Sequence, residues 1–235
     1  MTAEKRIANL DGLRFIAAAV VAVCHFDLIK VHFGMQRTGW RFFSNSAQVA
    51  VTFFFVLSGF LITWLLLREK LGDNTGRISI RRFYGKRIRR IWPLYYLLLL
   101  LTFFVFREIS LLNPSLGNEL DAGNSLVMKR FTGYLFFLPN YTEYTWGPQF
   151  YFGQTWSLGV EEFFYLFFPV GLYFVSKKGV LKYLLILAML FFLLSAGVHF
   201  FNRFSPSASW LKSILFVFFD KYRIYAFAAG GIGAW

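Results

Sequence analysis

The stretch LDGLRFIAAAVVAVCHFDLIKVH, Leu10–His32, decides the fold because it is long and apolar enough to cross a bilayer. A membrane-spanning helix needs about 20 predominantly apolar residues. This stretch nevertheless contains Arg14, His25 and Asp27. An arginine at the centre of a spanning helix costs about 2.5–3.5 kcal/mol on insertion scales, so such residues are kept where they are paired or functional. The first span is therefore the place to look for function.

Several polar residues of this span fall near one face of the predicted helix. Arg14 and His25 are eleven positions apart, so at about 100° per residue they differ by roughly 20° around the axis and by about 16 Å along it. Asp11 precedes Arg14 by one turn and lies near the same face, as does His32. The residues between them on this face are small or apolar: Ala18, Val21 and Ala22. The spacing predicts a narrow polar track facing the protein interior.

Composition places the whole chain in the membrane. Of its 235 residues 57% are hydrophobic and only 16% are charged, whereas soluble domains carry about 25% charged residues. Backbone polar groups in hydrocarbon must be paired internally, which favours helices. We predict an all-α, polytopic integral membrane bundle with a single domain over residues 1–235. The lone cysteine, Cys24, excludes an internal disulfide and is interpreted as a packing residue.

About six spans are predicted. They cover residues 10–32, 49–67, 91–106, 156–175, 180–201 and a last apolar run from about 210, which contains charged residues and stops abruptly at Trp235. The apolar segment 131–139 is too short to cross and is predicted to be re-entrant or interfacial. Because no polar tail follows the last run, we expect the chain to be a fragment of a longer membrane protein.

The net charge is +13, and the position of the basic residues along the chain gives the predicted orientation. Lys and Arg gather on the cytoplasmic side of helical membrane proteins, and the most basic stretch is 68–90. This places the amino terminus in the cytoplasm, Arg14 near the cytoplasmic face and His25 in the outer half. We interpret the basic charge as a rim that meets anionic lipid, and we predict no nucleic-acid partner.

Two further motifs allow two interpretations each. Ser58 and Gly59 interrupt the second span, where glycine permits close approach of a helix or a ligand and serine can form hydrogen bonds. Arg87 and Arg90 lie one turn apart before the third span, and paired guanidinium groups suit a phosphate-bearing ligand. The alternatives are a packing notch for the first motif and anchoring to lipid headgroups for the second.

Four sequence motifs occur in a characteristic order: LDGLR followed by His25, FFFVLSGF, FYGKRIRRIWP and TWSLGVEEFFYLFFP. In that order they resemble the membrane acyltransferase-3 family, whose members acylate sugars of bacterial surface polysaccharides and some small acceptors. The strongest elements are Arg14 with His25, and Trp156 followed by Glu161. The chain resembles a C-terminally truncated member.

The resemblance implies transfer of an acyl group, usually acetyl, from cytoplasmic acyl-coenzyme A to a hydroxyl of a cell-surface glycan or its lipid-linked precursor. His25 would be the general base or a transient acyl carrier. The other implied catalytic residues are Arg14, which steers the donor or stabilises negative charge, Asp11, which orients Arg14, and Glu161. The implied substrate-binding residues are Arg87 and Arg90 for the coenzyme phosphates, Ser58, Gly59, and Trp156 for stacking on a sugar.

The expected partners are the lipid bilayer, acyl-coenzyme A and a glycan or other hydroxyl acceptor, with no tightly bound cofactor and no metal. The expected location is the bacterial cytoplasmic membrane. Simpler interpretations remain: an Asp11–Arg14 pair that only fixes helix packing, a packing role for His25, ordinary interface roles for His32 and His199, and contact of Glu162 with water or headgroups. A proton-coupled transporter using the Arg14 and His25 track is the alternative function, and a non-catalytic scaffold is the third.

Overall fold

The computed structural model describes residues 10–32, 34–36, 41–72, 77–109, 123–147, 149, 152–204, 217 and 223–235. All regular structure in these ranges is helical, which confirms the predicted all-α class. The main helices are α1 (Leu10–His32), α2 (Arg41–Gly72), α3 (Ile80–Leu100), α5 (Gly123–Leu135), α6 (Pro139–Trp146), α7 (Trp156–Phe174), α8 (Val180–Phe204) and α10 (Ile224–Ala234). Short turns of helix, η1 (Leu101–Val105), η2 (Phe106–Glu108), η3 (Gly153–Thr155) and η4 (Lys177–Gly179), extend or join them.

Four helical stretches in the described part of the chain are long and apolar enough to cross a membrane. They are residues 10–30, 46–72, 80–105 and 177–200, and they match four of the six predicted spans. The predicted span 156–175, which forms α7, is not among them because Glu161 and Glu162 lower its hydropathy, and α10 has only 11 residues. The protein is therefore an integral membrane helical bundle.

Two helices begin before the spans that hydropathy predicts for them. The second span runs through all of α2, and the third starts at Ile80, so the basic segment 80–90 forms one continuous helix with the apolar residues after it. Pro93 lies inside α3. Hydropathy reports only the part of a helix that suits hydrocarbon, whereas the helix itself continues into the polar region.

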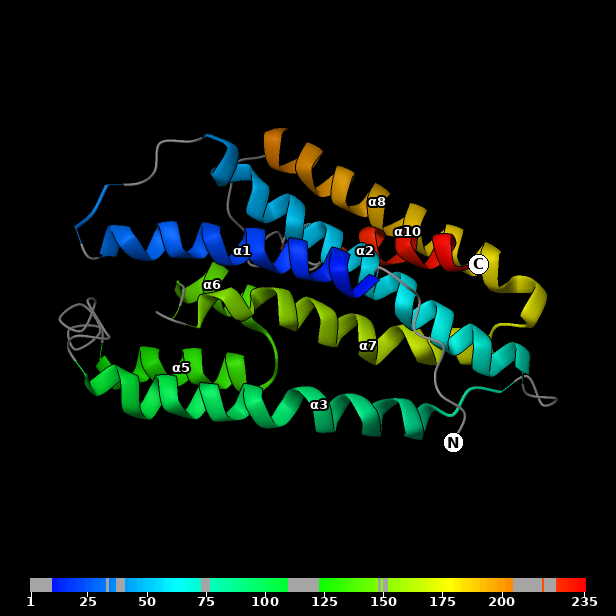
Figure 1. Ribbon diagram of the computed structural model, residues 1–235, viewed down its shortest axis with the longest axis horizontal. Helices are drawn as coiled ribbons and strands as arrows, with labels where there is room; N and C mark the ends of the chain where they lie inside the picture. The colour runs from blue at the N-terminus through cyan, green and yellow to red at the C-terminus, as the bar shows by residue number, and fades with distance from the viewer. Residues whose placement is uncertain are drawn as a thin grey trace.

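The longest helices lie roughly along one direction (Figure 1). The connection from α2 to α3 and the connection from α7 to α8 lie at the same end of the molecule, on the right in Figure 1. Basic side chains lie at both connections, with Arg77 before α3, Arg81 and Arg82 in the first turn of α3, and Lys177 and Lys178 in η4. We refer to this as the basic end. The structure thus gathers the basic loops on one side, as the prediction of a cytoplasmic rim requires.

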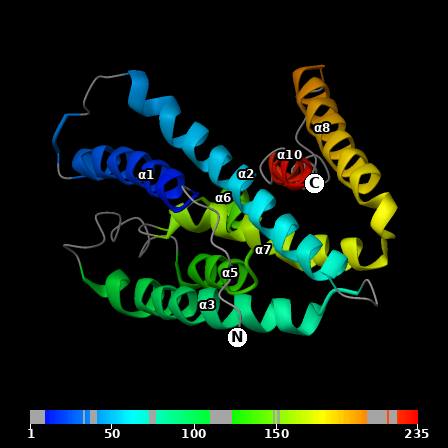
Figure 2. The same cartoon turned by 45° about the vertical axis from the view of Figure 1, so that its right-hand side comes forward.

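Helix α10 packs closely against α2, and Figure 2 shows it between α2 and α8. The approach depends on two glycines. A Cβ added at Gly59 would lie 2.0 Å from the carbonyl oxygen of Phe227, and one added at Gly230 would lie 1.9 Å from that of Val56. Small residues at a membrane helix interface let the backbones touch. The notch around Gly59 therefore receives a helix.

The short apolar segment around residues 131–139 forms a helical hairpin. Helix α5 ends well before the basic end of the bundle, and the chain turns back into α6 (Figure 1). The turn contains Phe137 with a positive φ of 56°, and its ring stacks on that of Tyr95 with 4.2 Å between centroids. The hairpin enters the bundle and leaves on the same side, and its re-entrant or interfacial position in the membrane stays a prediction.

Candidate active site

The Glu161 carboxylate is the centre of a polar cluster within the bundle. Its Oε1 accepts a hydrogen bond of 3.3 Å from Ser58 Oγ on α2, and its Oε2 accepts one of 2.6 Å from the Tyr165 hydroxyl on α7. Ser58 is 1% exposed and Tyr165 is buried. The bond from Ser58 joins residues 103 positions apart in sequence. Both carboxylate oxygens are thus held in a defined orientation.

Two guanidinium groups complete this cluster. Arg14 on α1 and Arg87 on α3 both interact electrostatically with the Glu161 carboxylate. The Arg87 guanidinium carbon lies 5.0 Å from the centre of the Tyr165 ring and 5.5 Å from that of Phe83, so stacking on two rings fixes its position. Helices α1, α2, α3 and α7 therefore meet at one carboxylate and two cations. Glu162 lies beside Glu161 and also interacts with Arg87, so the charges of the two carboxylates and the two guanidinium groups balance.

His25 lies farther along α1, and its ring orientation defines its chemistry. Its Nδ1 is 2.8 Å from the carbonyl oxygen of Val21. A carbonyl oxygen only accepts hydrogen bonds, so Nδ1 carries the proton in this arrangement. In the neutral ring Nε2 then has the free electron pair, which is the atom that a general base or a nucleophile uses. The side chain is half-buried.

The inward face of α1 differs from the predicted one by a rotation. Ala17 and Cys24 are buried, whereas Ala18 and Ala22 are exposed, so the predicted centre of the track was wrong. Measured from Ala17, Arg14 lies about 60° and His25 about 80° around the axis. Both are half-buried on the same flank of the face that packs on α2. The sequence predicted that Arg14 and His25 share one side of α1, but only the packing on α2 decides which residues lie at the middle of the buried face.

The predicted pairing of Asp11 with Arg14 does not occur. Asp11 is exposed, and the ion pairs between side chains that the structure describes join Lys30 to Asp27 and Arg82 to Glu69. A carboxylate at the helix end that meets solvent gains little from turning toward a partner. Arg14 interacts electrostatically with Glu161 of α7, and the role implied for Asp11 stays a prediction that this geometry does not support.

The predicted substrate-binding residues are not all brought together. Ser58 and Arg87 join the Glu161 cluster, whereas Arg90 is exposed and Gly59 faces the backbone of α10. Trp156 is half-buried at the start of α7, with its ring edge-on to Phe55 at 6.0 Å. That edge contact makes it part of the core packing, and its stacking on a sugar remains a prediction. The side chain of His32 lies outside the described part.

Sequence reasoning missed two contributors to this region. Tyr165 follows Glu161 by four residues, so helical spacing was a signal that would have paired them. Glu162 was interpreted as meeting water or headgroups, but its Oε2 accepts a hydrogen bond of 3.4 Å from Trp92 Nε1. Its Oε1 is buried and has no hydrogen-bond partner among the described residues. The interpretation of Glu162 was wrong because α3 covers that side of α7.

Comparison with known proteins identifies the family of the chain. A family model described as an acyltransferase domain matches residues 7–234. The chain is 31% identical over 182 residues, 75% of its length, to the "Putative peptidoglycan O-acetyltransferase YrhL" of Bacillus subtilis, and covers 26% of that protein. It is 30% identical over 171 residues, 72% of its length, to the "Peptidoglycan O-acetyltransferase OatA" of Listeria monocytogenes, and covers 24% of it.

A "Putative O-acetyltransferase" of Staphylococcus aureus is 31% identical over 171 residues, 70% of this chain and 24% of that protein. The chain thus covers about a quarter of the length of these relatives. No solved structure matches the chain significantly. Because the family model covers nearly every residue, including those that form the Glu161 cluster, the chain belongs to the membrane acyltransferase-3 family.

Proposed function

We propose that this chain carries the acyl-transfer centre of a membrane O-acyltransferase. The donor is cytoplasmic acyl-coenzyme A, with acetyl as the acyl group, and the acceptor is a hydroxyl of a cell-surface glycan or its lipid-linked precursor. The membrane is the bacterial cytoplasmic membrane, with the amino terminus inside. Membership of the acyltransferase-3 family supports the reaction class. The single observation that carries the proposal is the Glu161 cluster within a membrane bundle, in which Ser58 and Tyr165 bond the carboxylate and Arg87 stacks on the Tyr165 ring.

The division of roles follows from distance along α1. About 16 Å of helix separates Arg14 from His25, so one thioester carbonyl cannot touch both side chains. We therefore assign Arg14 and Arg87 to the anionic coenzyme, which enters from the basic end, and His25 to the reacting carbonyl. Arg90, exposed one turn after Arg87, would contact the outer phosphates of the coenzyme. Glu161 and Glu162 balance the two half-buried guanidinium groups when the donor is absent.

The reaction requires one proton transfer and one acyl transfer. As general base, His25 Nε2 takes the proton from the acceptor hydroxyl while its oxygen attacks the thioester carbon, and the coenzyme thiolate leaves and is protonated. As an acyl carrier, Nε2 attacks the thioester itself, releases the thiol and then passes the acyl group to the hydroxyl. Both routes need the free electron pair that the bond from Nδ1 to Val21 leaves on Nε2.

The test is transfer of radiolabelled acetyl from acetyl-coenzyme A in membranes that contain the full-length protein. His25→Ala should lower the rate by about 10²–10⁴, the usual contribution of a positioned base, and Arg14→Ala should raise the KM for the donor. His199→Ala, at an exposed position on α8, is the matched control and should be unchanged.

Retention of full activity by His25→Ala would overturn the assignment. Absence of acyl transfer by the wild type, together with uptake of a solute driven by a proton gradient in proteoliposomes, would instead identify a transporter.

A further inference from the structure

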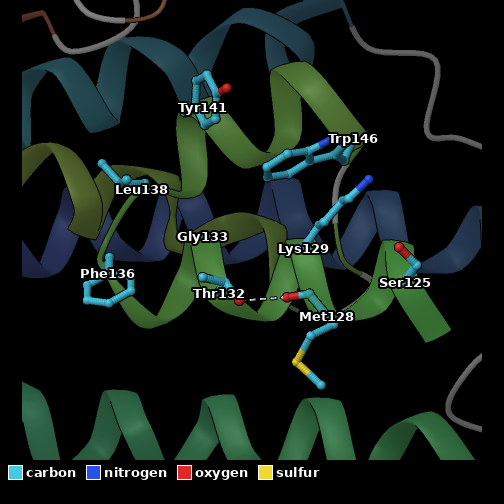
Figure 3. Close-up of a pocket in the computed structure, with 9 residues that line it drawn as sticks. All are labelled: Ser125, Met128, Lys129, Thr132, Gly133, Phe136, Leu138, Tyr141 and Trp146. Carbon is cyan, nitrogen blue, oxygen red and sulfur yellow. Dashed lines mark hydrogen bonds between the residues drawn. The ribbon is translucent and has the colours of Figure 1, made fainter.

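The α5–α6 hairpin carries a groove that is separate from the Glu161 cluster. Its volume is about 530 Å³, within the range of small-molecule sites. The lining residues come from both helices and the turn between them (Figure 3): Ser125, Met128, Lys129, Thr132, Gly133, Phe136, Leu138, Tyr141 and Trp146. The contact of α6 with the start of α7 links the groove to the rest of the bundle.

The groove is polar at one end and apolar at the other. Ser125, Lys129 and Trp146 lie toward one end in Figure 3, whereas Phe136 and Leu138 lie at the other, beside the hairpin turn. The turn is the part of the hairpin that enters the bundle (Figure 1). The polar end is therefore nearest the membrane surface, and the apolar end lies deeper. A ligand that fits this gradient has a polar head and a lipid tail.

The polar end supplies an available cation. Lys129 is exposed and forms no hydrogen bond or ion pair with any other residue that the structure describes. The neighbouring Arg130 is bound within the protein, because its Nε donates a hydrogen bond of 2.9 Å to the carbonyl oxygen of Trp146 at the end of α6. Lys129 can therefore pair with an anion that enters the groove, without giving up a contact within the protein.

Two aromatic rings stand beside this cation. The rings of Tyr141 and Trp146 pack edge to face, with centroids 5.7 Å apart and an interplanar angle of 84°. Each ring holds the other in place, and both line the groove. Aromatic faces receive the C–H faces of sugar rings, so a fixed pair next to a cation suits a saccharide that bears a negative charge.

Two apolar side chains of the groove, one near each end, face outward. The Phe136 side chain is 67% exposed and that of Met128 is 57% exposed. In a membrane protein such side chains meet lipid chains, and here they line the same concave surface as Lys129. A phosphate held by Lys129 would place an attached hydrocarbon tail along Met128 and Phe136.

We propose that this groove binds the acceptor in lipid-linked form, as a sugar joined through phosphate to a polyprenyl-type chain. The tail lies along Met128 and Phe136, the phosphate pairs with Lys129, and the sugar contacts Tyr141 and Trp146. This inference rests on the proposed function and selects the lipid-linked precursor over the finished polymer as the molecule that is acylated.

The test measures binding without any acyl donor. The full-length protein in nanodiscs is exposed to a polyprenyl phosphate-linked N-acetylglucosamine whose tail carries a photoreactive group, and labelled peptides are mapped by mass spectrometry. We expect label within residues 123–147. Lys129→Met should weaken binding roughly tenfold, as loss of a charge-assisted contact does, and Lys129→Arg should retain it. Phe136→Ser tests the tail contact, and Lys182→Met, at an exposed position on α8, is the control.

Competition separates the possible ligands. Unlabelled polyprenyl phosphate sugar should displace the probe, whereas phosphatidylglycerol and the same sugar phosphate without a tail should not. Equal displacement by phosphatidylglycerol would reduce the groove to an ordinary anionic lipid contact and overturn the proposal, as would label outside the hairpin or unchanged binding in Lys129→Met. Intact photolabelling with no acyl transfer would reject the proposed function alone.

Discussion

The Tyr165 hydroxyl donates a hydrogen bond of 2.6 Å to Oε2 of Glu161, and the face of the same ring lies 5.0 Å from the Arg87 guanidinium carbon. One side chain therefore positions both the anion and a cation of the cluster. Since Glu161 and Tyr165 are one helical turn apart, this relationship is internal to α7. It presents a prearranged surface to α1, α2 and α3.

Tyr165→Phe isolates the hydroxyl, because phenylalanine keeps the ring under Arg87. Loss of a hydrogen bond to a carboxylate is worth about 1.5–3 kcal/mol, so we expect acyl transfer per folded molecule to fall by roughly tenfold or more. The measurement is kcat and KM for acetyl-coenzyme A, normalised to the amount of folded protein. Tyr173→Phe on the same helix should not change either constant. A reduced yield of folded protein with unchanged constants would mean a structural role only.

Gly59→Ala should destabilise the bundle. The new Cβ would lie 2.0 Å from the carbonyl oxygen of Phe227, so α10 must move away from α2. Overpacking of this kind costs typically about 1–3 kcal/mol. The measurement is the thermal midpoint of unfolding in detergent. Gly197→Ala on α8 has no atom within 4 Å of the added Cβ and is the matched control. Equal midpoints for the two variants would contradict the packing assigned to Gly59.

Lys70→Met should loosen the basic end. Lys70 is 2% exposed, and its Nζ donates a hydrogen bond of 2.7 Å to the carbonyl oxygen of Leu172 near the end of α7. A cation at a helix carboxyl end also offsets the helix dipole. We expect the free energy of unfolding to fall by about 1–3 kcal/mol. Urea unfolding followed by tryptophan fluorescence measures this, and Lys178→Met, at an exposed position, should have no effect.

Sidedness can be tested with two single cysteines in a Cys24→Ser background. A cysteine in place of Lys178 lies at the basic end, and one in place of Ser125 lies at the polar end of the hairpin groove. In intact cells we expect an impermeant thiol reagent to label Ser125→Cys alone. Lys178→Cys should react only after the cytoplasmic face is opened. The reverse pattern would invert the proposed orientation.

The sequence by itself determined the class of the protein and the contents of its first helix. Hydropathy and helical periodicity are local properties, so a low charged fraction predicted an all-α membrane bundle and eleven-residue spacing placed Arg14 and His25 on a common side. The motifs in order predicted the family that the comparison found. Length also predicted that the apolar segment 131–139 does not cross, because nine residues are too few to span a bilayer.

Only the tertiary structure decided which of these residues meet. Ser58 reaches Glu161 across 103 positions of sequence, Arg87 stacks on Tyr165 from another helix, and Trp92 covers Glu162. The same packing turns Asp11 to solvent and seats α10 against Gly59. Each outcome depends on how one helix is rotated about its axis and how closely it approaches its neighbour. A rotation by one residue is about 100°, and no local pattern in the sequence fixes that rotation.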